Sequence, residues 1–133
     1  MTRPRTILIV SDDAQVESMR SAFSARRFAV STTTDYESAY RQLLDTQTDL
    51  VVVDIAGAAT GVEFIKRVRA TPNLTQPLLL VVAEWGTGGA TLALQQRADA
   101  YEPKPIAAAR LVDSIERLLG TKALPAKRMS GAE

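Results

Sequence analysis

The stretch Leu50-Val51-Val52-Val53-Asp54 decides the fold of this sequence. It consists of four apolar residues in succession, and it stops abruptly at a carboxylate. A run that is apolar at every position is typical of a strand buried on both faces, as in the centre of a parallel sheet. Ligand crevices in doubly wound sheets open at the carboxyl ends of the strands, so chemistry is expected at Asp54.

Length and composition limit what this chain can be. Its 133 residues suffice for one domain with a sizeable core. The net charge of +1 gives no general attraction to nucleic acid or membrane. Cysteine and histidine are both absent, which excludes disulfides, thiolate catalysis, the usual zinc sites and imidazole acid–base chemistry. The first apolar run, 7–10, is too short for a signal peptide or a membrane span, so we expect a cytoplasmic location.

Strands and helices are predicted to alternate along the whole chain. Further strands are expected over 6–11, 28–32, 78–82 and 99–102. Helices are expected from Asp13, from a capping box at 34–37, from a second box at 60–63, from the glycines near 86–89 to about 97, and over 106–119. This alternation predicts an α/β fold, a doubly wound five-stranded parallel sheet with helices on both faces. The fold class expected is the flavodoxin-like (βα)5 type, and if its strand order is 2-1-3-4-5, the first and third strands are neighbours.

The ends of several elements are also predicted. Tyr36 and Leu44 are expected on the buried face of the helix that opens at 34–37. Pro103 is expected to end the last strand, and Gly120 to end the last helix as a C′ glycine. The domain would then span 1–120, followed by a flexible tail over 121–133.

Acidic side chains follow two strands that are neighbours in the predicted sheet. Asp12 and Asp13 follow the first strand, and Asp54 ends the third. Three carboxylates in one crevice require a cation. Lys104, at the end of the fifth strand, and Mg²⁺ are the predicted cations, because magnesium takes carboxylates, a loop carbonyl, waters and phosphate oxygens. Such a site lets an aspartate act as a nucleophile and become an acyl phosphate.

Together these residues resemble the signature of the receiver domain of two-component response regulators. The signature consists of the Asp12-Asp13 pair, Asp54 and Lys104-Pro105, each at the expected strand end and in the expected order. The spacing agrees along about the first 120 residues, so the chain resembles a single-domain regulator of the chemotaxis type.

The resemblance implies a role for each of these positions. Asp54 would accept a phosphoryl group from a phosphohistidine on a sensor histidine kinase or a histidine phosphotransfer protein. Asp13 and Asp54 would hold Mg²⁺ with the backbone carbonyl of Ala56, and Asp12 would act through water. Lys104 would pair with the phosphoryl oxygens.

The chain departs from the family pattern at its switch positions. Val82 stands where the family carries Thr or Ser, whose hydroxyl bonds the phosphoryl group, and Tyr101 is the aromatic residue coupled to that hydroxyl. A hydrogen bond to a charged group contributes ~1.5–3 kcal/mol, as much as typical allosteric coupling of ~1–3 kcal/mol. The loop after Asp54 lacks the usual proline and is one residue short, and Arg97-Ala98 replaces Gly-Ala.

Several functions compete on this pattern. The leading hypothesis is a signalling domain that is not an enzyme, beyond its own phosphorylation and dephosphorylation, and that contacts an unidentified downstream protein. The alternative is a phosphorylation-independent (pseudo-receiver) docking domain. An aspartate-nucleophile phosphatase is disfavoured, because it requires a second Asp where Ala56 stands. A dinucleotide site is disfavoured as well, because the chain has no G-x-G-x-x-G loop after the first strand. Nucleic-acid and membrane partners are not expected. The resemblance implies a homodimer through the fourth and fifth helices, which is common in the family.

Overall fold

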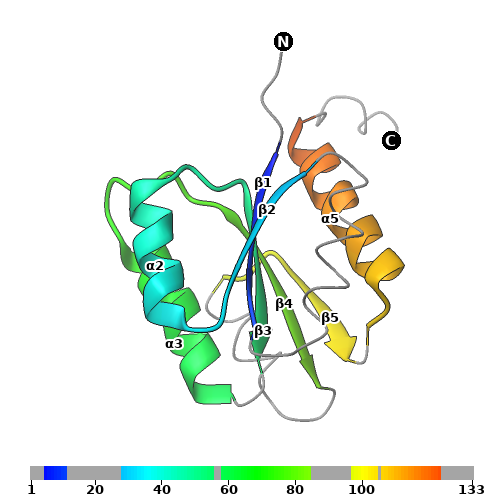
Figure 1. The fold of residues 1–133 in the computed structure, drawn as a ribbon, viewed down its shortest axis with the longest axis horizontal. Coiled ribbons are helices and arrows are strands. Elements are labelled where there is room, and N and C mark those ends of the chain that lie inside the picture. Colours follow the sequence, from blue (N-terminus) through cyan, green and yellow to red (C-terminus); the bar gives the residue numbers. More distant parts are fainter. Residues whose placement is uncertain (1–4, 12–27, 56–57, 85–96, 105, 124–133) are drawn as a thin grey trace.

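The computed structural model contains one five-stranded sheet in which every pair of neighbours is parallel (Figure 1). The structure describes residues 5–11, 28–55, 58–84, 97–104 and 106–123. Its strands are β1 (Thr6–Val10), β2 (Ala29–Thr33), β3 (Leu50–Ile55), β4 (Leu78–Glu84) and β5 (Ala100–Lys104). Their order is β2-β1-β3-β4-β5, so the predicted fold class and strand order are confirmed.

Helices cover both faces of the sheet. They are α2 (Tyr36–Asp45), α3 (Ala58–Ala70) and α5 (Ala108–Ala123). Figure 1 shows α2 and α3 together on one face and α5 on the other. The helix predicted from Asp13 lies outside the described residues, and so does the helix predicted after 86–89, up to residue 96.

The uniform apolarity of β3 follows from this sandwich. Leu50 and Val52 pack in the core beneath α5, whereas Val51 and Val53 pack in the core beneath α2 and α3. All four are at most 1% exposed. Each such side chain contributes about 1.5–3 kcal/mol through burial. Because side chains alternate along a strand, the next residue, Asp54, follows Leu50 and Val52 toward the α5 face.

The N-terminus of α2 differs from its predicted capping box. The N-cap is Asp35, not Thr34: its Oδ1 atom accepts a hydrogen bond from Ser38 N at 2.8 Å. This backbone hydrogen bond is the main cause that lowers the pKa of Asp35. Glu37 does not close the box but pairs with Arg67 at 2.8 Å, and the hydrogen bond from Arg67 lowers its pKa. The N-cap lies one position later than predicted, because Asp35 has an extended conformation and is the last residue before the helix.

Other helix predictions also need correction. α3 begins at Ala58, so Thr60 lies inside the helix and not at the predicted N-cap position. α5 continues past Gly120 to Ala123, and a Cβ atom at Gly120 would meet nothing within 4 Å, so neither a turn nor close packing requires this glycine. Leu44, predicted to be buried, is 53% exposed.

The last strand runs through the proline that was expected to end it. β5 continues past Pro103 to Lys104, and Pro103 pairs in register with Ala83 of β4. β5 lies at the edge of the sheet and has a partner strand on one side only. Proline is tolerated in an edge strand where its nitrogen is turned away from the neighbouring strand.

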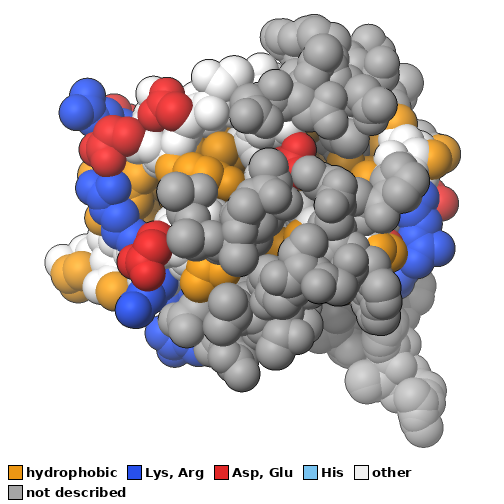
Figure 2. Space-filling model, turned by 90° about the horizontal axis from the view of Figure 1, so that it is seen from below, with side chains coloured by type: hydrophobic (Ala, Val, Ile, Leu, Met, Phe, Trp, Pro, Cys, Tyr) orange, Lys and Arg blue, Asp and Glu red, His pale blue; other side chains and the backbone are white. Residues whose placement is uncertain are grey.

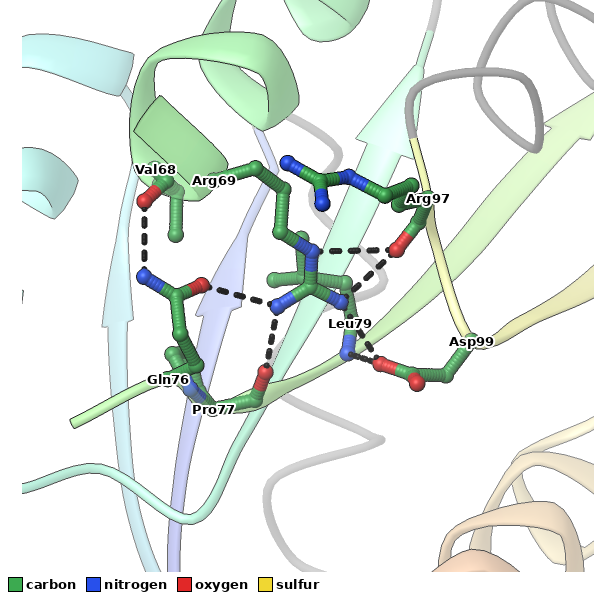
Figure 3. Close-up of polar contacts among 7 residues, drawn as sticks. All are labelled: Val68, Arg69, Gln76, Pro77, Leu79, Arg97 and Asp99. Carbon is green, nitrogen blue, oxygen red and sulfur yellow. Dashed lines mark hydrogen bonds and ion pairs between the residues drawn. The ribbon is translucent and has the colours of Figure 1, made fainter. Parts of the chain in front are cut away.

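A polar cluster at the amino ends of β4 and β5 ties α3 to the sheet (Figure 3). We call it the Arg69 cluster. The Arg69 guanidinium donates from Nε and Nη2 to the Arg97 carbonyl (3.0 and 2.8 Å), from Nη1 to Gln76 Oε1 (2.9 Å) and the Pro77 carbonyl (3.0 Å), and from Nη2 to Asp99 Oδ2 (2.8 Å). Arg97 has φ 73°, a left-handed conformation that glycine adopts readily and that disfavours residues with a Cβ atom.

Candidate functional site

Asp54 stands at the carboxyl end of β3 with its carboxylate held from the neighbouring strand. Ser11, the residue after β1, donates a hydrogen bond from Oγ to Asp54 Oδ2 at 2.5 Å. The other carboxylate oxygen, Oδ1, is buried. The carboxylate therefore has a fixed direction at the edge of the sheet where a crevice was predicted.

The sequence interpretation missed Ser11. It took the acids after the first strand as the neighbours of Asp54, but the register pairs Val10 with Val53, which sets the following residue, Ser11, beside Asp54. Counting the register from the two apolar runs would have found it. Asp12, Asp13 and Ala56 lie outside the described residues, so their magnesium roles stay predictions.

Val82 completes a row of three residues across β1, β3 and β4. It pairs in register with Asp54, packs in the core beneath α5 and is 3% exposed. The row thus reads Ser11, Asp54, Val82, so an aliphatic side chain lies next to the carboxylate on the β4 side. Valine has no hydroxyl that could bond a phosphoryl group.

Tyr101 lies on the opposite face of the sheet from Val82. Its ring packs against the core beneath α2 and α3, and its hydroxyl donates to the Ala83 carbonyl at 3.3 Å. Lys104 is the last residue of β5 and pairs in register with Glu84. The backbone of Lys104 thus reaches the carboxyl edge of the sheet, and its contact with a phosphoryl group stays a prediction.

A second hydroxyl holds Asp54 from the other side of the sheet. Tyr36, the first residue of α2, donates from its hydroxyl to the backbone carbonyl of Asp54 at 3.1 Å. The sequence placed Tyr36 only on the buried face of a helix. No local signal reveals this contact, because it joins residues 18 apart that meet only in the folded chain.

Charged side chains of both signs lie around this edge among the described residues. Figure 2 views the molecule from below, toward the carboxyl ends of the strands, and side chains of both charges gather over α2 and α3 on its left. Among the described residues no three acidic side chains lie together as a metal site. An oxygen donor at this edge, in a chain without cysteine or histidine, is the donor chemistry that Mg²⁺ prefers.

The comparisons with known proteins agree with this geometry. The family model described as response regulator receiver domain matches residues 7–116. The chain belongs to the response regulator receiver domain family. The family acts in two-component signalling, so the predicted function class is confirmed at that level.

Curated relatives of this receiver domain are longer proteins. It is 31% identical over 121 residues to "Transcriptional regulatory protein PrrA" of Mycobacterium leprae (strain TN), covering 90% of this chain and 51% of that protein. It is 30% identical over 118 residues to "Response regulator MprA" of Mycobacterium sp. (strain KMS), covering 87% of this chain and 51% of the relative. The receiver domain thus spans about half the length of the curated relatives it matches. The expectation that nucleic acid is not a partner is not supported, because one of these relatives is named as a transcriptional regulatory protein.

Solved structures share the fold. A CheY-like response regulator receiver domain protein from Methanospirillum hungatei JF-1 superposes with a TM-score of 0.79 at 21% identity, covering 90% of this chain and 97% of that one. A response regulator signal receiver domain from Bermanella marisrubri gives 0.80 at 24% identity, covering 87% and 98%. Within the described part of the receiver domain, no helix is long and apolar enough to cross a membrane.

Proposed function

We propose that this receiver domain is phosphorylated on Asp54 and signals through protein contacts. One observation carries the proposal: the Asp54 carboxylate stands at the carboxyl end of β3, held by Ser11 Oγ at 2.5 Å. A carboxylate held in one direction at the open edge of a doubly wound sheet suits in-line attack on a phosphorus atom.

The reaction transfers a phosphoryl group without a net change in oxidation state. An Asp54 carboxylate oxygen attacks phosphorus and forms an O–P bond. The P–N bond to the donor's imidazole breaks, and its electron pair returns to the ring nitrogen, which then takes a proton. The product is an acyl phosphate on Asp54.

A magnesium ion and Lys104 would balance the negative charge of the transferred phosphoryl group. Mg²⁺ would be held by Asp13, Asp54 and the Ala56 carbonyl, with Asp12 acting through water, and it would neutralise charge on the phosphoryl oxygens. Lys104 would pair with one of these oxygens. Asp54 itself is the nucleophile, so the domain catalyses at most its own phosphorylation and dephosphorylation.

Acetyl phosphate tests the proposal directly. The purified chain is incubated with acetyl phosphate and Mg²⁺, and its intact mass is measured. We expect a phosphoryl adduct that needs Mg²⁺ and disappears in Asp54→Asn, a variant that keeps the size of the side chain. An adduct that persists in Asp54→Asn, or no adduct in the wild type, would refute the assignment.

Val82 favours a second candidate function, a phosphorylation-independent docking domain. The row beside Asp54 offers an apolar side chain where a hydroxyl would bind the phosphoryl group. If acetyl phosphate forms the adduct but leaves the backbone amide NMR spectrum unchanged away from Asp54, docking without a phosphorylation switch is the better description.

The partners and location complete the proposal. The donor would be a sensor histidine kinase or a histidine phosphotransfer protein, and the output would be a downstream protein or a second copy of the chain. A cytoplasmic location remains a prediction from the sequence.

A further inference from the structure

Two hydroxyl groups hold Asp54, one on each face of the sheet. Ser11 Oγ donates to the carboxylate, on the face that α5 covers. Tyr36 donates from its hydroxyl to the main-chain carbonyl, from the face that α2 and α3 cover. A displacement of the Asp54 backbone would move the carboxylate as well, because the carbonyl carbon and the side chain are attached to the same Cα.

The Tyr36 hydroxyl has a well-defined position. Tyr36 is the first residue of α2, directly after the N-cap Asp35, whose side chain accepts from Ser38 N and fixes the first turn. Its ring packs on Phe64 of α3, with centroids 5.2 Å apart and planes tilted by 35°. Phe64 is 3% exposed and belongs to the core. The hydroxyl is thus placed by two helices at once.

We propose that Tyr36 is a positioning residue for the phosphoacceptor and that it links Asp54 to the α2–α3 surface. The inference rests on the proposed phosphorylation of Asp54. The hydrogen bond from Tyr36 would connect Asp54 to the surface of the domain without a hydroxyl on β4, where Val82 stands, because it is made to the backbone of Asp54.

The surface that would respond is a groove between α2 and α3. It has a volume of about 520 Å³ and a lining that includes Tyr36 and Phe64. Glu37 and Arg67 form an ion pair on its rim at 2.8 Å. A change in the Asp54 peptide would move the Tyr36 hydroxyl, and with it the ring that forms one wall of the groove.

The test compares Tyr36→Phe with Tyr40→Phe. Each variant loses one hydroxyl from α2, but the Tyr40 hydroxyl bonds Thr71 Oγ1 at 2.7 Å and not Asp54. We measure the rate of adduct formation across a range of acetyl phosphate concentrations with Mg²⁺. Tyr36→Phe should lower the maximal rate about three- to tenfold, the range expected for loss of one hydrogen bond, and leave the half-saturating concentration within about twofold. Tyr40→Phe should match the wild type. Equal rates for all three proteins, or equal losses in both variants, would overturn the positioning role.

Two NMR signals separate this inference from the proposed function. Before any donor is added, Tyr36→Phe should move the ¹³C resonance of the Asp54 carboxylate, and Tyr40→Phe should not. If the wild type forms no adduct, phosphorylation fails as the function, and this resonance alone decides whether Tyr36 positions Asp54. When the wild type does form the adduct, beryllofluoride should shift the ring signals of Phe64, and Tyr36→Phe should abolish that shift. An adduct without a shift at Phe64 would disprove the link to the α2–α3 surface.

Discussion

Replacing Arg69 by methionine should destabilise the fold more than the same replacement of Arg67, the other arginine of α3. Methionine keeps most of the aliphatic stem and removes every N–H donor. Arg69 is 12% exposed in its side chain and Asp99 is 34% exposed. In the variant, the carbonyls of Arg97 and Pro77 lose their charged donor, whereas Asp99 keeps its hydrogen bond from Leu79 N at 2.7 Å.

The magnitude follows from these contacts. A hydrogen bond to a charged group contributes ~1.5–3 kcal/mol, and removing one partner of a fully buried ion pair costs ~3–5 kcal/mol. The Arg69–Asp99 pair is only partly buried, and the contacts of one guanidinium do not add independently. We therefore expect a loss of about 2–3 kcal/mol from a total of about 5–15 kcal/mol.

Urea unfolding measures this loss. With an m-value of about 2 kcal/mol/M, the midpoint should fall by about 1–1.5 M. Arg67→Met is the matched control, two residues away on the same helix. Arg67 is 48% exposed, and its ion pair with Glu37 at the surface should contribute little. The reasoning fails if Arg69→Met costs under about 1 kcal/mol or if both variants are destabilised equally.

Three further outcomes are expected. Val82→Thr adds a hydroxyl beside Asp54 and should tighten beryllofluoride binding about tenfold or more, as measured by calorimetry; unchanged affinity would argue against Val82 as the switch position. Arg97→Gly should raise the free energy of unfolding by about 1 kcal/mol, because φ 73° disfavours residues with a Cβ atom, whereas Arg97→Ala should bring no such gain in the same urea assay. The Ser38 backbone hydrogen bond lowers the pKa of Asp35 below its ordinary 3.8. The stabilisation that this hydrogen bond gives to the folded state is therefore present above pH 3.8 and is lost as the pH falls through the pKa of Asp35 in the folded state. The stability difference between wild type and Asp35→Ala should therefore shrink in acid, and a difference independent of pH would contradict this cause.

The sheet could be predicted from the sequence because each buried strand is a continuous apolar run. β3 and β4 lie between helices on both faces, so both faces of each strand had to be apolar, and the runs at 50–53 and 78–82 carry that signal. The carboxylate that follows the apolar run, Asp54, likewise located the candidate site, although β3 continues one residue further to Ile55. The alternation of strands and helices predicted a parallel sheet with helices on both faces, whereas the order 2-1-3-4-5 came from a known doubly wound fold type.

The details of the site depend on tertiary geometry that a single sequence does not show. Ser11 meets Asp54 across 43 positions, and Tyr36 meets it across 18. Neither contact has a local pattern. The N-cap of α2 was misplaced by one residue because Thr34 and Asp35 are both good capping residues, and only the backbone conformation chooses between them. Arg97 likewise carries no mark of its left-handed φ.

Pro103 limits how this sheet can associate with other chains. Leu79 exchanges hydrogen bonds with Asp99 on the β5 side, so by the two-residue repeat Ala83 also faces β5 and its partner Pro103 faces outward. The outer edge of β5 therefore lacks an N–H donor at this position. A free edge with an unbroken row of donors and acceptors is a template for strand addition and aggregation. With that row interrupted, two copies that meet along β5 would be joined by side chains, which favours a reversible complex over a continuous intermolecular sheet.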